Sequence, residues 1–276
     1  MRTTVAGNRG LRKWLALAGA AGVLLLAQAG CVLRSSSDGA ASRDIVTESD
    51  EPEARKRARI RMELAVGYFE QGQTNVALDE LKQVIAADPG FPDAYNLRGL
   101  IYMRLNDLRQ AEDSFRRAVA LNPGDSNVQH NYGWLLCQQA RFEESQRAFD
   151  LAMSNALYVG RAKTLMAQGL CQARAGKIAE AERSLARSYE LDAGNPVTGY
   201  NLANLLYRRG EYARSQFYIR RLNNSELANS ETLWLGIKVE RRLNDEVAMN
   251  QLADQLKKRF GRSPEAAAFE RRAFDE

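Results

Sequence analysis

The side chains that could support catalysis are few in this chain of 276 residues. It has one histidine, His130, and three cysteines, Cys31, Cys137 and Cys171. They are accompanied by no Cys-x-x-Cys pair, no second histidine for a zinc site, no glycine-rich phosphate loop and no Gly-x-Ser-x-Gly motif. Acid–base and metal chemistry need such groups in clusters. The sequence therefore predicts a protein that is not an enzyme and that holds no metal and no cofactor.

Paired short helices must position these residues. Within residues 91–124 apolar side chains recur with a helical period, which predicts one helix over Asp93–Leu105 and a second over Leu108–Leu121. Gly99 and Ala111 stand where two antiparallel helices would cross, so their small side chains allow close packing of the axes. This pattern resembles the tetratricopeptide repeat, a helix-turn-helix unit of about 34 residues.

Phased copies of this unit run through most of the chain. The marker residues of the other copies are Ala65, Ala77 and Leu81; Gly133, Ser145 and Phe149; Gly169, Ala181 and Leu185; Ala203, Ser215 and Ile219; and Gly236, Ala248 and Leu252. Two extra residues near Gly160 separate the third copy from the fourth. One repeat cannot bury its apolar face alone, whereas stacked repeats can. We therefore expect an all-α, right-handed superhelical solenoid of about six repeats over residues 54–276, closed by a C-terminal capping helix that starts at Ser263-Pro264.

The first thirty residues are of another kind. Basic residues up to Lys13 precede a short apolar run, Trp14–Ala27, and Ala29-Gly30-Cys31 follows. This order predicts a secretory signal peptide over residues 1–30, and the ending resembles the lipobox of bacterial lipoproteins, in which the cysteine is acylated and becomes the new N-terminus. Val32 stands where such lipoproteins carry Asp when they stay in the inner membrane, which favours the outer membrane. The alternative is a soluble exported protein with a chance cysteine.

Residues 31–53 are predicted to form a flexible tether behind the lipidated Cys31. They are rich in Ser, Asp, Gly, Ala and Glu and poor in large apolar residues, so they cannot offset the entropy of ordering.

The charge of the chain gives no sign of a nucleic-acid partner. Residues 1–30 carry four of the 39 basic residues and no acidic one, which leaves 35 basic and 34 acidic residues in the remainder. A nucleic-acid surface needs a clustered basic face, which this nearly neutral remainder does not indicate.

The residues expected to face a protein partner lie on the first helix of each repeat, which lines the binding face of such solenoids. On the first three repeats the predicted partner-binding groove consists of Met62, Val66, Phe69, Asn96, Leu100, Met103, Arg104, His130, Trp134 and Gln138. Repeats five and six add Tyr200, Asn204, Tyr207, Arg208, Leu233, Ile237, Glu240 and Arg241. An apolar floor with amide and guanidinium donors suits a short peptide segment, and Trp134 is the best candidate for an anchor. The alternative for each residue is that it completes the core between neighbouring helices.

Cys137 and Cys171 fall on the first helices of adjoining repeats, which pack side by side. Exported chains meet an oxidising compartment, so a disulfide between them is one alternative. Two buried thiols acting as small apolar core residues are the other.

The order of parts resembles a known family. A lipobox, a short tether and six repeats are joined by the stretch His130–Leu136 (HNYGWLL) and by Arg141–Glu144 (RFEE). Together they resemble the PilF/PilW pilotins, the type IV pilus biogenesis and stability lipoproteins. The resemblance implies an outer-membrane lipoprotein facing the periplasm that binds secretin subunits and promotes their targeting and multimerisation. We expect the protein to be a monomer. The alternative is a periplasmic scaffold lipoprotein that recruits peptidoglycan synthases or outer-membrane insertion factors.

Overall fold

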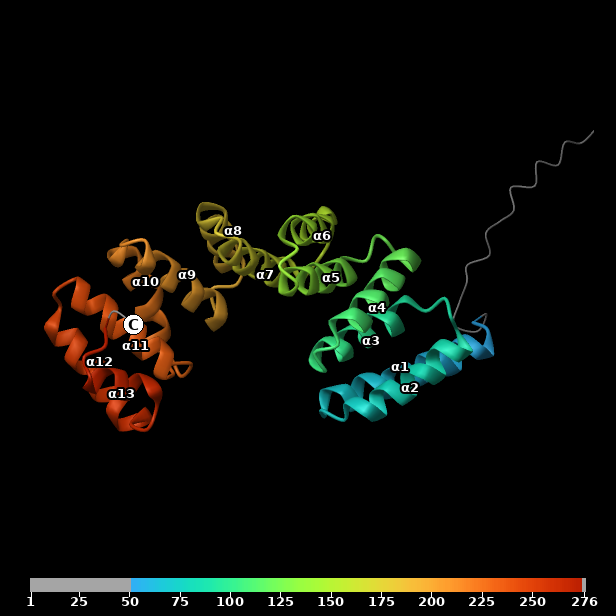
Figure 1. The fold of residues 1–276 in the computed structure, drawn as a ribbon, viewed down its shortest axis with the longest axis horizontal. Coiled ribbons are helices and arrows are strands. Elements are labelled where there is room, and N and C mark those ends of the chain that lie inside the picture. Colours follow the sequence, from blue (N-terminus) through green and yellow to red (C-terminus); the bar gives the residue numbers. More distant parts are fainter. Residues whose placement is uncertain (1–50, 275–276) are drawn as a thin grey trace, which may run out of the picture. The chain divides into compact units, whose positions relative to one another are not determined.

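The computed structural model describes residues 51–274, and this part of the chain contains helices and no strand (Figure 1). The helices are α1 Glu53–Glu70, α2 Thr74–Ala87, α3 Pro92–Arg104, α4 Leu108–Leu121, α5 Ser126–Gln138, α6 Phe142–Ser154, α7 Arg161–Arg174, α8 Ile178–Leu191, α9 Pro196–Arg208, α10 Tyr212–Asn223, α11 Ser230–Arg242, α12 Glu246–Phe260 and α13 Pro264–Glu270. The predicted signal peptide, Cys31 and most of the tether lie outside the described residues.

Consecutive helices pack as six pairs, from α1 with α2 to α11 with α12. The second helix of each pair also contacts the first helix of the next pair, so the pairs are stacked in chain order. This arrangement confirms the predicted all-α repeat solenoid. The predicted boundaries of α4 are correct, and those of α3 are shifted by one residue at each end.

The small residues at the helix crossings are buried as the repeat pattern predicts. A Cβ on Gly99 would lie 2.7 Å from the Phe115 ring, and one on Gly133 would lie 2.9 Å from the Phe149 ring. Ala65, at the equivalent place in α1, is fully buried. A larger side chain at these points would push the two helices of a pair apart.

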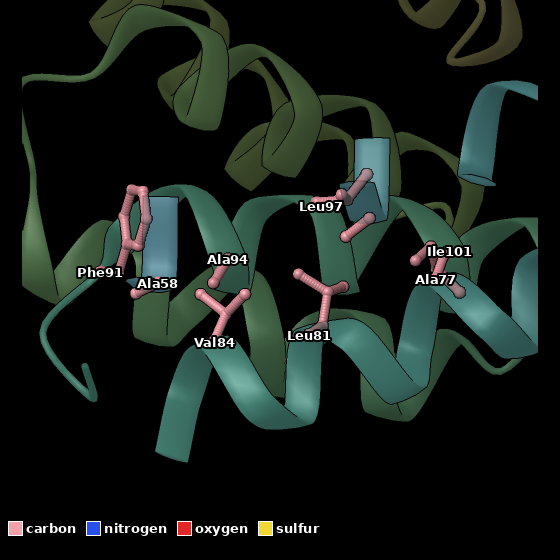
Figure 2. Close-up of a cluster of buried hydrophobic side chains, with 9 residues drawn as sticks. Ala58, Ala77, Leu81, Val84, Phe91, Ala94, Leu97 and Ile101 are labelled. Carbon is pink, nitrogen blue, oxygen red and sulfur yellow. The ribbon is translucent and has the colours of Figure 1, made fainter. Parts of the chain in front are cut away.

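The core is made of several apolar clusters that join each pair to the next. In the first such cluster, Leu81 and Val84 of α2 pack with Ala94, Leu97 and Ile101 of α3 (Figure 2). The apolar face of the first pair is therefore buried only because the second pair covers it.

One residue in the turn of each pair adopts the left-handed backbone conformation. These residues are Gly72, Asn106, Ala140, Gly176, Gly210 and Asn244, with φ between 58° and 80°. They recur every 34 residues except between Ala140 and Gly176, where the interval is 36. Glycine and asparagine tolerate this conformation well, and alanine does not. Ala140 is thus the turn residue whose type fits its backbone least.

The two extra residues lie in the loop between α6 and α7, where the sequence predicts them. Tyr158 in this loop is buried, and its hydroxyl accepts a hydrogen bond from Thr164 Oγ1 at 3.3 Å. Leu157 and Val159 on either side are almost fully exposed. The loop is therefore pinned to α7 through Tyr158.

The C-terminal end of the repeats is covered by α13, which agrees with the predicted capping helix. The Ser263 hydroxyl accepts a hydrogen bond from the backbone N–H of Ala266 at 3.1 Å, so Ser263 is the N-cap. Phe269 of α13 packs edge-on against Trp234 of α11, with ring centroids 6.4 Å apart. The apolar face of the last pair is thereby removed from water.

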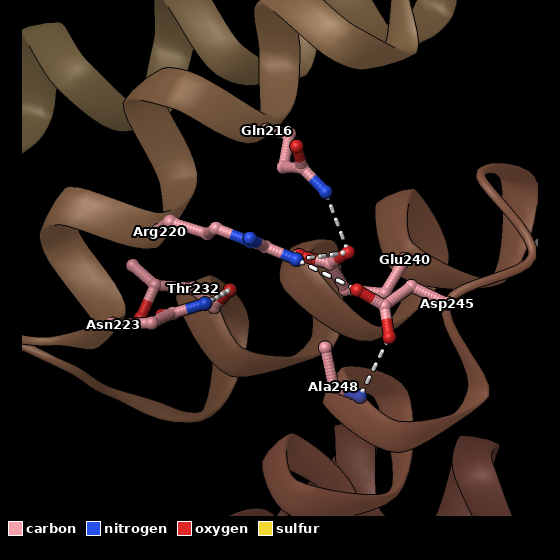
Figure 3. Close-up of polar contacts among 7 residues, drawn as sticks. All are labelled: Gln216, Arg220, Asn223, Thr232, Glu240, Asp245 and Ala248. Carbon is pink, nitrogen blue, oxygen red and sulfur yellow. Dashed lines mark hydrogen bonds and ion pairs between the residues drawn. The ribbon is translucent and has the colours of Figure 1, made fainter.

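A buried carboxylate links the last two pairs. Glu240 of α11 is fully buried and accepts hydrogen bonds from Arg220 Nε at 2.7 Å and from Gln216 Nε2 at 2.7 Å (Figure 3). Arg220 also pairs with Asp245 at 3.0 Å. These bonds raise the pKa of the Arg220 guanidinium. Because α10 supplies both donors, the contact holds α10 against α11.

Candidate functional site

The predicted groove residues on α1 and α3 are mostly half-buried. Met62, Val66 and Phe69 pack against the core cluster that joins the first two pairs. Leu100 and Met103 pack in the same way against the cluster around Phe115. Their buried parts complete the core between neighbouring helices, and the rest of each side chain is exposed. The structure does not test whether a partner binds there.

Two predicted groove residues, Asn96 and Arg104, form hydrogen bonds across repeats. Arg104 is exposed, yet its Nη1 donates to the backbone oxygen of Phe69 at 3.0 Å, and its guanidinium lies 4.9 Å from the centre of the Phe69 ring. Asn131 Nδ2 donates to Asn96 Oδ1 at 3.0 Å. These donors already have partners, so a ligand would have to displace those bonds before using them.

His130 lies in the core, with 5% of its surface exposed. Its Nδ1 is 2.9 Å from Thr164 Oγ1, and that hydroxyl donates in turn to Tyr158. Burial, with a smaller contribution from the positive charge of Lys163, lowers the pKa of His130 to about 4. His130 is therefore a neutral structural residue that ties α5 to α7 and is not open to a partner.

Trp134 is half-buried and packs beside the pair of cysteines in the same cluster as Phe149. Cys137 of α5 and Cys171 of α7 are joined by a disulfide, with their Cα atoms 5.8 Å apart. The structure thus contains the bridged alternative. Gln138, at the end of α5, is exposed. On the sixth repeat, Leu233, Ile237 and Glu240 are fully buried and present no surface.

A hollow lined by residues of first helices lies farther along the chain, between α7 and α9. It has a volume of about 460 Å³ and is lined by Leu170, Ala173, Arg174, Gly176, Ile178, Leu185, Asn201, Asn204, Leu205, Arg208 and Arg209. We call this the α7–α9 groove. Asn204 and Arg208 are among the residues predicted from sequence, whereas Leu170 and Arg174 are not. Leu170 and Arg174 lie 34 residues before Asn204 and Arg208, so applying the repeat length to these two residues would have predicted them.

The α7–α9 groove is positively charged. Arg209 is neutralised by Glu182 and by Glu211, the latter at 2.9 Å. The side chains of Arg174 and Arg208 make no ion pair or hydrogen bond within residues 51–274, and the lining includes no acidic residue. An apolar floor beneath two uncompensated guanidinium groups can bind a chain segment with carboxylate groups.

Comparison with known proteins now identifies the repeats. Residues 62–126 match the tetratricopeptide repeat family. Over 209 residues the chain is 28% identical to the type IV pilus assembly protein PilF of Pseudomonas aeruginosa, a match that covers 76% of the chain and 83% of that protein. The chain is a tetratricopeptide repeat homologue of PilF.

Solved structures agree with this relationship. The crystal structure of PilW, a widely conserved type IV pilus biogenesis factor, matches this chain with a TM-score of 0.71 and 27% identity. The match covers 77% of this chain and 97% of PilW. The structure of P. aeruginosa PilF matches with a TM-score of 0.72 and 25% identity, covering 80% of this chain and all of the other. The predicted resemblance is confirmed.

Within residues 51–274 of the PilF homologue, no helix is both long and apolar enough to span a bilayer. In the same residues no group of His, Cys, Asp or Glu side chains is arranged to hold a metal ion.

Proposed function

We propose that the chain is an outer-membrane pilotin lipoprotein, which binds secretin subunits and promotes their outer-membrane targeting and multimerisation in type IV pilus biogenesis. The observation that carries this proposal is the likeness to PilF and PilW, which extends over 97% or more of both solved structures. The likeness therefore includes the whole repeat array and not only one common repeat.

The physical properties of the chain suit such a role. An acyl chain on Cys31 would give affinity for the membrane, and a stack of repeats gives a large face for specific protein contact. Holding both on one chain raises the effective concentration of the bound subunit at the membrane. Neither part requires catalysis, which agrees with the sparse chemical inventory.

Deletion of the gene tests the proposal. We expect loss of secretin multimers from the outer membrane and loss of twitching, both restored by the wild-type gene. A Cys31→Ser variant should leave the protein unanchored and the multimers depleted. Normal multimers and normal twitching in the deletion strain would reject the pilotin role. Co-purification of peptidoglycan synthases or outer-membrane insertion factors in place of secretin would favour the scaffold alternative.

The contribution of the first-helix face is tested separately with Trp134→Ala. We expect weaker binding of secretin by the purified variant, with unchanged helix content by circular dichroism. Phe217→Ala is a matched control, because Phe217 is an exposed aromatic residue on a second helix, α10. If both variants bound secretin within twofold of the wild type, Trp134 would not be an anchor.

A further inference from the structure

We propose that the α7–α9 groove is a docking site for an acidic peptide segment, in which glutamate or aspartate side chains alternate with apolar ones. This deepens the proposed function, on which it rests for the identity of the partner, because it states the chemistry that the partner segment must have. The argument has three parts: the floor, the charges and the amide groups.

The floor of the groove is apolar and firmly held. Leu185 and Leu205 are buried in the core that joins the fourth pair to the fifth, and their lining atoms therefore have fixed positions. Leu170 is half-buried beside them. Apolar side chains of a bound segment would remove this surface from water.

The charges above this floor are uncompensated. Arg174 and Arg208 occupy the last turns of α7 and α9, at equivalent positions of successive repeats. The equivalent residue of the second repeat, Arg104, donates to the Phe69 carbonyl, whereas Arg174 and Arg208 have no such bond among the described residues. Guanidinium groups stay charged at any pH that the protein meets. The pair therefore attracts carboxylates.

The amide groups offer a contact to the backbone of the segment. Asn201 Nδ2 donates to the Val197 carbonyl at 2.8 Å and is engaged. Asn204 lines the groove one turn farther along α9 and makes no side-chain hydrogen bond within residues 51–274. An asparagine amide both donates and accepts, so it can pair with the peptide backbone of an extended chain.

Two guanidinium groups on different helices call for two carboxylates. Acidic side chains along a segment supply them, whereas the α-carboxylate of a chain terminus alone supplies one. The occupant of this proposal is therefore an internal acidic segment, and a segment with a free C-terminal carboxylate is the alternative that the test below distinguishes.

Fluorescence anisotropy tests the inference with the full chain purified in detergent micelles. The probe is a dye-labelled, C-terminally amidated octapeptide that alternates glutamate and leucine, and the control peptide carries glutamine for each glutamate. We expect saturable binding of the acidic peptide that weakens as salt is added. Arg174→Gln and Arg208→Gln should each weaken binding about fivefold, and the double variant about 25-fold. Arg183→Gln is the matched control, because Arg183 is exposed on α8 and does not line the groove.

Several results would overturn the inference: no saturable binding by the wild type, equal binding of the glutamine peptide, or a double variant that binds as the wild type does. If Arg183→Gln weakened peptide binding as much as the groove variants do, the effect would come from the overall charge of the protein and not from the groove. Much tighter binding of a peptide with a free C-terminal carboxylate would show that the terminus is the ligand. Failure here leaves the pilotin role intact if gene deletion still removes secretin multimers, so the two proposals fail separately.

Discussion

Gly99 of α3 lies directly against the ring of Phe115 of α4, so that a Cβ at Gly99 would stand 2.7 Å from Phe115 Cε1. The same relationship recurs one repeat later between Gly133 and Phe149. The phenylalanine ring and the absence of a side chain on the glycine together set how closely the two helices of a pair approach each other. The contact thus defines the packing of each of these pairs.

Replacing Gly99 by alanine should destabilise the protein. The new methyl group must displace a fully buried ring, which typically costs about 1 to 3 kcal/mol of the free energy of unfolding. Urea unfolding followed by circular dichroism measures the change. Gly67→Ala is the matched control, since nothing lies within 4 Å of a Cβ there and alanine favours the interior of α1 by about 1 kcal/mol. Equal effects of the two substitutions would contradict the packing argument.

Replacing Ala140 by glycine should stabilise the protein. Ala140 adopts φ 60°, a conformation that costs an L-residue about 1 kcal/mol, while the added freedom of glycine in the unfolded chain offsets part of the gain. We expect a net increase of roughly 0.5 kcal/mol in the free energy of unfolding. The reciprocal change, Gly176→Ala, should lower it by about 1 kcal/mol, because Gly176 has φ 76°. A destabilised Ala140→Gly variant would mean that the turn carries no strain.

Replacing Arg220 by methionine should cost about 3 kcal/mol. The buried carboxylate of Glu240 would keep Gln216 as a donor but lose its counter-charge (Figure 3). Chemical denaturation reports the loss. Arg262→Met is a suitable control, because Arg262 is exposed and makes no ion pair within the described chain. If the two variants were equally stable, the Glu240 contact would contribute nothing.

The stability of the fold should depend on the protonation of His130. Its pKa is about 4 in the folded protein and near 6.5 in the unfolded chain. Between these values the unfolded chain binds a proton that the folded protein does not, so the free energy of unfolding falls as pH decreases from 6.5 towards 4, by on the order of 3 kcal/mol. Above pH 6.5 this contribution is fully present.

Denaturation curves recorded across this pH range test the prediction, with His130→Gln as the comparison. Glutamine can still bond to Thr164 but does not titrate. The variant should lose the pH dependence that comes from this site. An identical pH profile for variant and wild type would show that other groups cause it.

Removing the disulfide should destabilise the protein by roughly 3 to 4 kcal/mol, because the bridge closes a loop between residues 34 apart in sequence. The double variant Cys137→Ala with Cys171→Ala isolates this effect. Thiol counting of the unreduced protein gives an independent check, since detection of both thiols would contradict the bridge. Reducing agent should lower the stability of the wild type and leave that of the double variant unchanged.

The sequence alone indicated the repeat, its register and its helix ends, because these depend on local features. Helix α4 begins after Asp107, whose side chain accepts from the Gln110 N–H, and it ends before Asn122-Pro123, which cannot continue a helix. Gly99 marked a crossing because the spacing of small residues is itself the signal.

Tertiary structure alone decided which first-helix residues are exposed and which groups meet across repeats. The sequence pattern predicts both His130 and Trp134 as groove residues. In the structure His130 is buried against Thr164, whereas Trp134 is only half-buried. Arg104 and Arg174 hold equivalent positions, yet only Arg104 has a backbone carbonyl to bond. Helical periodicity states the direction in which a side chain leaves its own helix. What it meets depends on the spacing and angle between successive pairs, and these follow from all the packing contacts together.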